Sequence, residues 1–279
     1  HEQRIEPYEV VDFSANINPL GPSQRGLDAL NAQLRYISHY PDATNDDVLN
    51  AIADTYGIDK HQIIVGNGAA ELLYAICRLP GYTGAFVPAP GFSEYKEALE
   101  ASKIPVRDIF YRPREDDNGK PYFEVPYLAL ETFAAELKGQ DGRIIVFLGN
   151  PNNPDGTLLD KDHIRTVASM LKDANSLLVI DESFIDFVGN DPLQDNEYSM
   201  RSLVNEFDNI IVVHSFTKFY AVPGLRIGAA FTNKTLITQL QQYIPSWSVN
   251  TLAQAYTKAA LNDVDYIKRT KQEINEERV

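Results

Sequence analysis

Cysteine is the scarcest informative residue in this sequence, with Cys77 the only one among 279 residues. A single thiol cannot form a disulfide within the chain, which excludes a disulfide-stabilised scaffold and fits a reducing cytoplasm. No apolar run approaches the roughly 20 residues that a membrane-spanning helix needs, and no signal peptide opens the chain. The sequence therefore predicts a soluble cytoplasmic protein without a membrane partner.

Basic residues are also in short supply. The chain has 25 Lys and Arg against 39 Asp and Glu, a net charge of -14. Without a strongly basic run, it lacks the electrostatic signature of a nucleic-acid-binding protein. Hydrophobic residues make up 44% of the 279 positions, which is enough for one large α/β domain with a full core.

Apolar runs alternate with amphipathic segments along most of the chain. This alternation predicts an α/β fold with a mostly parallel sheet that is covered by helices on both faces. The segment 111–122 is charged and predicts a surface hairpin or loop. The predicted strands are 63–65, 85–88, 104–109, 144–148, 177–180, 210–213 and 225–231, and the main predicted helices are 27–34, 46–56, 72–79, 127–137, 161–172, 235–243 and 251–261.

The stretch Ser215-Phe216-Thr217-Lys218 directly follows the predicted strand 210–213. The carboxyl end of such a strand is where α/β sheets bind their ligands. A lysine amine in this place can form a Schiff base, and Ser215, Thr217 and Arg226 suit a phosphate group. Taken alone, the same pattern is more often a polar surface loop.

A second candidate follows the strand 63–65, where Gly66-Asn67-Gly68-Ala69-Ala70 leads into a helix. A glycine-rich turn before a helix presents free backbone N–H groups and the positive end of the helix dipole, so Gly68, Ala69 and Ala70 form a candidate phosphate cup. The alternative is a tight Asn-Gly turn, although such turns usually join two strands.

Three more strand ends carry candidate residues. Phe92 follows strand 85–88 and either covers a flat ring or belongs to the core. Asn153 follows strand 144–148 and offers a side-chain amide. Asp181 ends strand 177–180, where its carboxylate either binds a ligand or caps a turn.

Together these residues match the needs of pyridoxal 5'-phosphate, in chain order. This cofactor needs a phosphate cup, a ring stacker (Phe92), a donor to its phenolate oxygen (Asn153), a carboxylate for its ring nitrogen (Asp181) and an amine for its aldehyde (Lys218). Asp181 would keep the ring nitrogen protonated, and Lys218 would form the Schiff base and transfer protons. No metal site is predicted.

The blocks Asn153-Pro154-Asp155-Gly156, Asp181-Glu182, Ser215-x-Thr217-Lys218 and Gly224-Leu225-Arg226-x-Gly228 resemble the signatures of fold-type I pyridoxal-phosphate enzymes of the class I/II aminotransferase group. The resemblance runs from about residue 10 to 262. It implies a three-layer αβα large domain and a homodimer in which Tyr40 reaches the cofactor phosphate of the partner subunit. It also implies an N-terminal arm at 1–40, the cofactor-binding large domain at 41–262, and a helix at 263–279 that leads towards a C-terminal small domain.

Within that group, Asp12-Phe13-Ser14-Ala15-Asn16-Ile17-Asn18-Pro19-Leu20-Gly21 and the segment from Thr217 to Arg226 most resemble threonine-phosphate decarboxylases. This resemblance implies decarboxylation of a phosphorylated hydroxy-amino acid, with Asn18 and Gly21 near the substrate. An aminotransferase such as histidinol-phosphate aminotransferase is the alternative. A non-catalytic pyridoxal-phosphate-binding regulator is a remote third, because no DNA-binding helix-turn-helix accompanies the pattern.

The sequence departs from the group in two respects. Phe184 stands where many of these aminotransferases have a tyrosine that donates to the cofactor phenolate, which leaves Asn153 as the main donor. The arginine that grips the substrate carboxylate belongs to the small domain, which the resemblance places beyond Val279. The chain lacks an initiator methionine and ends within a helical pattern, so we expect a segment beyond these residues and weak turnover without it.

Overall fold

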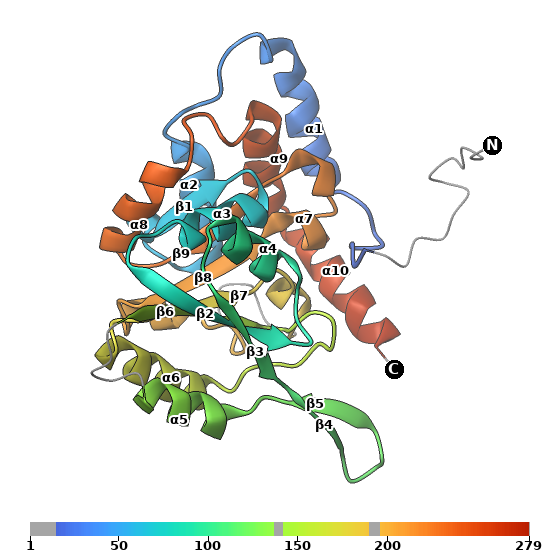
Figure 1. Ribbon diagram of the computed structural model, residues 1–279. Coiled ribbons are helices and arrows are strands. Elements are labelled where there is room, and N and C mark those ends of the chain that lie inside the picture. The colour runs from blue at the N-terminus through green and yellow to red at the C-terminus, as the bar shows by residue number, and fades with distance from the viewer. Residues whose placement is uncertain (1–14, 137–141, 190–195, 279) are drawn as a thin grey trace, which may run out of the picture.

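The computed structural model contains a seven-stranded sheet with helices on both faces, and a two-stranded hairpin that extends away from it (Figure 1). It describes residues 15–136, 142–189 and 196–278. The strand order is β1-β9-β8-β7-β6-β2-β3. Strand β9 runs antiparallel to both of its neighbours, and the other neighbouring pairs are parallel.

The elements follow the alternation that the sequence predicts. The strands are β1 Ile63–Gly66, β2 Tyr82–Ala89, β3 Val106–Phe110, β4 Arg112–Glu115, β5 Pro121–Glu124, β6 Arg143–Gly149, β7 Leu177–Asp181, β8 Ile210–Ser215 and β9 Gly228–Phe231. The helices are α1 Gln24–Gln33, α2 Asp46–Tyr56, α3 Gly68–Cys77, α4 Glu94–Ala101, α5 Tyr127–Glu136, α6 Lys161–Asp173, α7 Phe216–Phe219, α8 Lys234–Leu240, α9 Thr251–Leu261 and α10 Val264–Glu277. Short 3-10 turns include η4 Ile185–Phe187, η6 Arg201–Asn205 and η7 Pro223–Leu225.

Two hydrophobic cores form because successive residues of a strand point to opposite faces of the sheet. Val179 and Ile211 belong to the core that includes side chains of α3, α4 and α8. Ile180 and Val212 belong to the core that includes side chains of α2, α5, α6 and α9. The predicted three-layer αβα arrangement with a mostly parallel sheet is therefore confirmed (Figure 1).

One strand begins later than the sequence predicts. The last strand was predicted over 225–231 but begins at Gly228, because the chain first makes the 3-10 turn Pro223–Leu225 and Arg226 adopts a left-handed conformation with φ 59°. Local turn chemistry outweighed the apolar pattern at this place. The sequence predicted no element within 199–207, where the structure has the short 3-10 turn Arg201–Asn205.

The strand register brings the candidate residues to one edge of the sheet. Asp181, at the end of β7, lies opposite Gly149 at the end of β6. Ser215, at the end of β8, lies opposite Gly228, and Gly228 in turn lies opposite Gly66. The carboxyl ends of these parallel strands are thus neighbours, as expected for a ligand site in an α/β sheet.

No helix in the described ranges is both long and apolar enough to cross a membrane. Over those same residues, no three or more His, Cys, Asp or Glu side chains gather in a way that could hold a metal ion.

Candidate functional site

A small cavity of about 80 Å³ lies at the exit of strands β6, β7 and β8. Four of the residues predicted from the sequence, Phe92, Asn153, Asp181 and Lys218, come together in its wall. They come from four separate chain segments, so only the fold assembles them. The other lining residues are Tyr95, Pro151, Ser183 and Phe184.

Asp181 is a buried carboxylate held by hydrogen bonds to both of its oxygens. It is 6% exposed. Its Oδ2 accepts a hydrogen bond from the Tyr95 hydroxyl at 2.9 Å. Its Oδ1 accepts from the Ser183 backbone N–H at 2.9 Å and from the Ser183 hydroxyl at 2.6 Å. These donors give both carboxylate oxygens a partner and fix the orientation of the side chain.

Lys218 lies in the short helix α7, directly after β8. Its Nζ donates to the Thr217 hydroxyl at 3.1 Å and lies 5.9 Å from the centre of the Phe184 ring. Burial lowers the pKa of the Lys218 amine below its ordinary value of 10.5, opposed by the Asp181 carboxylate and assisted by the Arg226 charge. A lower pKa gives more of the neutral amine, which is the form that attacks a carbonyl.

The predicted phosphate cup is assembled by close backbone contact between α3 and the residues that follow Lys218. Gly68 has φ 81°, and a Cβ at this position would lie 2.3 Å from Nη2 of Arg226. A Cβ on Gly228 would lie 2.5 Å from the backbone nitrogen of Ala69. Both glycines are therefore required for close approach, and the Arg226 guanidinium lies against the start of α3.

Hydroxyl groups continue the cup towards Lys218. The Ser215 and Thr217 hydroxyls are buried and lie 2.7 Å apart. Helix α3 begins at Gly68, so its first backbone N–H groups, including those of Ala69 and Ala70, have no acceptor within the helix. Free N–H groups, two hydroxyls and a guanidinium are suitable partners for a phosphate dianion.

Glu71 supports the turn before the cup, a role that no sequence pattern indicated. Its Oε2 accepts from the backbone N–H of Asn67 at 2.6 Å. The same oxygen accepts a hydrogen bond from the Ser248 hydroxyl. The carboxylate thus links the start of α3 to the segment before α9.

Asn18 was predicted to lie near the substrate, but the structure uses its side chain to fasten the arm. Its Nδ2 lies within 2.9 Å of three acceptors, which are the Phe219 carbonyl and the Tyr266 and Thr270 hydroxyls. Its backbone N–H donates to the Lys218 carbonyl at 3.1 Å. The amide is 3% exposed, so we assign Asn18 to positioning the arm, while its closeness to the substrate stays a prediction.

Gly21, the other residue predicted near the substrate, shapes the arm as well. It has φ 72°, a conformation that favours glycine. Its N–H donates to the Asn18 carbonyl at 3.2 Å, and its carbonyl accepts from the Tyr266 hydroxyl at 2.8 Å. Residues 12–14 of the predicted arm motif lie outside the described residues.

A larger cavity of about 580 Å³ adjoins the small one and shares Pro151, Asn153 and Phe184 with it. Asn16 of the arm lines this larger cavity. Its remaining lining residues are Lys120, Asn152, Pro154, Asp155, Gly156, Leu158, Phe187, Val188 and Arg278. A substrate that reaches Lys218 therefore has space next to an amide of the arm.

Tyr40 is not part of either cavity. Its side chain is 80% exposed. Its ring contacts that of Trp247, with 4.7 Å between the ring centres. The predicted role of Tyr40 in a partner subunit stays a prediction.

Tyr95 and Ser183 are the site residues that sequence reasoning missed. Ser183 follows Asp181 by two positions, the spacing at which an aspartate accepts from a backbone N–H in an Asx turn, so a signal was present. Tyr95 gave a weaker signal, because it occupies a buried position of α4 and looks like a core aromatic. Its ring indeed stacks on Phe147 at 5.2 Å, while its hydroxyl reaches Asp181.

Tyr95→Phe should lower activity by removing a hydrogen bond to Asp181, while the phenyl ring still fills the same place in the core. Burial, reinforced by Asp181, raises the pKa of the Tyr95 hydroxyl, so it remains a neutral donor. Phenylalanine keeps the stack on Phe147 but removes one hydrogen bond to a charged group, a loss of about 1.5–3 kcal/mol. We expect kcat/KM to fall roughly 10- to 100-fold. Tyr74→Phe, which removes a tyrosine hydroxyl away from the cavity, is the control, and equal activity of both variants would contradict the role of Tyr95.

The residues present fit pyridoxal 5'-phosphate. Asp181 is buried, hydrogen-bonded and, over the described residues, without an arginine or histidine in ion-pair distance, which suits a protonated ring nitrogen. Phe92 lies at the cavity wall with its ring edge-on to Tyr95 at 5.6 Å. The Gly68 position leaves no space for a side chain beside Arg226.

Comparison with known proteins agrees with this geometry. A family model described as aminotransferase class I and II matches residues 8–279. The chain is 34% identical over 269 residues to the adenosylcobalamin biosynthesis bifunctional protein CobDQ of Leptospira interrogans, covering 96% of this chain and 29% of that protein. It is 32% identical to the threonine-phosphate decarboxylase of Salmonella typhimurium, and the match covers 98% of this chain and 70% of that protein. It is 30% identical to histidinol-phosphate aminotransferase 2 of Pseudomonas aeruginosa, and the match covers 97% of this chain and 69% of that protein.

Solved structures show the same fold. The histidinol-phosphate aminotransferase from Clostridium acetobutylicum superposes with a TM-score of 0.82 at 25% identity, covering 96% of this chain and 74% of that chain. The histidinol-phosphate aminotransferase from Sinorhizobium meliloti, solved in complex with pyridoxal-5'-phosphate, superposes with a TM-score of 0.78 at 25% identity, covering 95% and 67%.

Proposed function

The chain belongs to the aminotransferase class I and II family of pyridoxal-phosphate-dependent enzymes, and from this premise we propose that it decarboxylates a phosphorylated hydroxy-amino acid. The proposal rests on the position of the N-terminal arm, the segment that contains Asn16 and Asn18. Asn18 fastens the arm to the Lys218 carbonyl, and Asn16 then lines the cavity beside Asn153. The arm is the segment whose sequence most resembles threonine-phosphate decarboxylases.

Four of the cavity residues would each hold a different part of the cofactor. Lys218 would bind it covalently through the neutral amine. Asp181 would accept the ring N–H, Phe92 would cover one face of the ring, and Asn153 would donate to the ring oxygen. The cup of Gly68–Ala70, Ser215, Thr217 and Arg226 would hold the phosphate. Pyridoxal phosphate, when bound, supplies an aldehyde that captures the substrate amine and a protonated ring that accepts electrons as a bond at the substrate Cα breaks.

The chain's residues then decide which Cα bond breaks. Only a bond that stands perpendicular to the ring can pass its electrons into it, so the substrate must be held at more than one point. Asn16 and the backbone of the arm offer donors on the side of Asn153 and could fix the carboxylate or the phosphate of a substrate. The Lys218 amine would be the group that returns a proton to Cα.

The alternative is an aminotransferase that acts on histidinol phosphate. It is favoured by the TM-score of 0.82 to the histidinol-phosphate aminotransferase from Clostridium acetobutylicum. The cofactor contacts would be the same in either case, because both reactions use the same electron sink. The difference would lie in the pose of the substrate.

The two functions are separated by assaying the purified protein with O-phosphothreonine, O-phosphoserine and histidinol phosphate. We expect CO2 release from one of the two phosphorylated hydroxy-amino acids and no need for a keto-acid co-substrate. Amino transfer from histidinol phosphate to 2-oxoglutarate, without CO2 from phosphothreonine, would establish the aminotransferase instead.

We also propose that two copies of the chain form the active unit, with Tyr40 acting across the interface. Tyr40 is 80% exposed and lies next to the half-exposed ring of Trp247, away from its own cavity. An exposed aromatic pair of this kind suits a protein interface. The exposed Tyr36 and Ile37, a few residues before Tyr40, would extend the same surface.

A further inference from the structure

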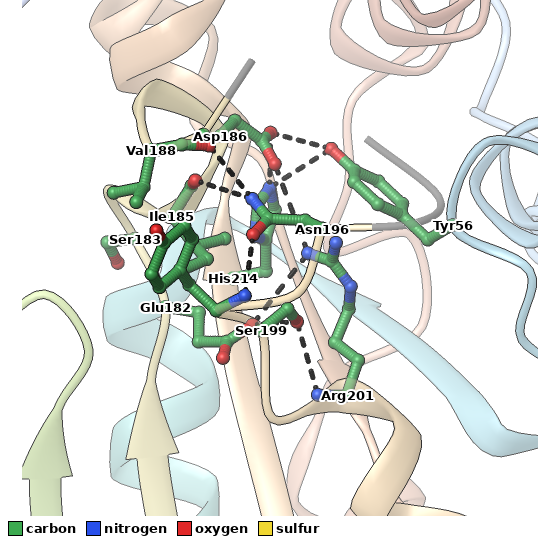
Figure 2. Close-up of polar contacts among 12 residues, drawn as sticks. Tyr56, Glu182, Ser183, Ile185, Asp186, Val188, Asn196, Ser199, Arg201 and His214 are labelled. Carbon is green, nitrogen blue, oxygen red and sulfur yellow. Dashed lines mark hydrogen bonds and ion pairs between the residues drawn. The ribbon is translucent and has the colours of Figure 1, made fainter. Parts of the chain in front are cut away.

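A cluster of charged and polar side chains is buried beneath the site. It comprises Tyr56, Glu182, Asp186, Arg201 and His214, and we refer to these five residues as the buried cluster (Figure 2). None of them is more than 3% exposed. They come from α2, the exit of β7, η4, η6 and β8, respectively.

The buried cluster lies on the opposite face of the sheet from the cofactor groups. Along β8, His214 is on the same face of the sheet as Val212, which belongs to one core. Ser215 is on the same face as Val213, which belongs to the other core. Glu182 directly follows Asp181 at the end of β7 and is therefore on the opposite face from it. Asp181 and Ser215 are thus each one position from a residue of the buried cluster.

Glu182 is the member with the most direct link to the site. Its Oε1 accepts from the Asn150 side chain at 3.0 Å, and its Oε2 accepts from the Ser199 hydroxyl at 2.7 Å. The backbone N–H of Met200 also donates to Oε1, at 2.5 Å. Arg201 lies 3.8 Å from Oε2.

Asn150 carries this link across to the neighbouring strand exit. Its backbone N–H donates to the Asp181 carbonyl at 2.8 Å, and its Oδ1 accepts from the Leu159 N–H at 3.1 Å. Asn150 therefore anchors both ends of the loop that contains Asn153. Through Asn150, the Glu182 carboxylate holds the Asn153 loop next to the strand that ends in Asp181.

Asp186 provides an internal comparison. It is as buried as Glu182 and lies 3.9 Å from the same Arg201. Its Oδ2, however, contacts the Tyr56 hydroxyl at 2.7 Å and His214 Nε2 at 3.1 Å. Within the described residues, Asp186 makes no hydrogen bond or ion pair with the Asn153 loop, so the two carboxylates share a charge environment but not a structural task.

A fully buried carboxylate is not needed for stability alone. Well-packed apolar side chains of similar volume are often as stable as a buried ion pair. Glu182 instead holds two strand exits that carry cofactor groups. We propose that Glu182 is a positioning residue that, through Asn150, sets the distance between Asn153 and Asp181 and so the fit of the cofactor ring.

The inference rests on the proposed roles of Asn153 and Asp181 at two atoms of that ring. If their spacing changes, the hydrogen bond to the ring oxygen and the contact to the ring nitrogen cannot both stay optimal. Both contacts influence the absorption spectrum and protonation of the bound cofactor. The affinity for the cofactor and the pH midpoint of its colour change therefore report the spacing independently of turnover.

Three variants of the pyridoxal-phosphate-loaded protein test the inference. Glu182→Met has a similar shape but no acceptor for Asn150. We expect its dissociation constant for pyridoxal phosphate to rise about tenfold, as for loss of one hydrogen bond to a charged group, and its colour midpoint to move. Glu182→Gln keeps an oxygen for Asn150, so its dissociation constant and its colour midpoint should both lie close to those of the wild type. Asp186→Leu, the matched control, should lower thermal stability while leaving both values near wild type.

Asn150→Ala is the second probe and removes the other half of the contact. It should produce the same spectral change as Glu182→Met, with no further change in the double variant. It also replaces Glu182→Met if that variant does not fold. An unchanged cofactor spectrum in Asn150→Ala, or an equal change in Asp186→Leu, would overturn the inference. A wild-type protein that forms no borohydride-reducible adduct at Lys218 would instead overturn the proposed function itself.

Discussion

Replacing Lys218 with alanine should abolish covalent capture of pyridoxal phosphate and reduce kcat/KM by at least about 100-fold, the lower range for loss of a general acid–base group. Among the eight residues that line the small cavity, Lys218 is the only one with an amine. Burial lowers the pKa of this amine below 10.5. The rate at which Lys218 captures pyridoxal phosphate should therefore rise with pH and reach half its maximum at a pH below 10.5.

The measurement is borohydride reduction of the loaded protein followed by peptide mapping. The pyridoxyl group should appear on the peptide that contains Lys218 and disappear in Lys218→Ala. Lys258 is the control, since its amine pairs with Asp47 at 2.7 Å on the exposed surface. A label that persists in Lys218→Ala and is lost in Lys258→Ala would refute the assignment.

Asp181→Asn should retain part of the cofactor affinity but lose most of the turnover. Asparagine keeps the size of the side chain and one acceptor oxygen, which can serve either Tyr95 or Ser183, but it removes the buried negative charge. Breaking a buried ion pair costs about 3–5 kcal/mol. If that cost falls on the transition state, kcat/KM should drop by roughly two to nearly four orders of magnitude.

Steady-state assays and a cofactor titration on the same samples check this expectation. Asp208→Asn is the control, because Asp208 forms an exposed ion pair with Lys172 at 3.0 Å far from any site role. Near-normal turnover of Asp181→Asn would mean that Asp181 only closes the turn to Ser183, the alternative that the sequence left open.

The predicted effects of these two substitutions differ for a physical reason. In the proposed function Lys218 would make and break bonds, so its loss would remove a chemical step. Asp181 would change no bond and would act by charge alone, so its effect would scale with how completely water is excluded. The 6% exposure of Asp181 and its three hydrogen bonds indicate a strong electrostatic contribution.

The layer architecture and the cofactor class were predictable from the amino-acid pattern. The apolar runs 144–148, 177–180 and 210–213 each proved to be a buried strand, because a strand covered on both faces needs an uninterrupted apolar run. Polar residues at the ends of such strands must meet at one edge of a parallel sheet. Asn153, Asp181 and Lys218 were therefore predictable as neighbours from the sequence, and Phe92 joins them from the segment after β2.

Tertiary structure alone decided which partners those residues have. Tyr95 and Asp181 are 86 positions apart, and Asn150 and Glu182 are 32 apart, so no local pattern relates them. The sequence placed Asn18 at the substrate, whereas its amide is consumed by contacts with residues more than 200 positions away. Strand phase and register specify which face a side chain occupies, but hydrogen-bond partners depend on how distant segments pack against that face, and that packing is set by the whole chain.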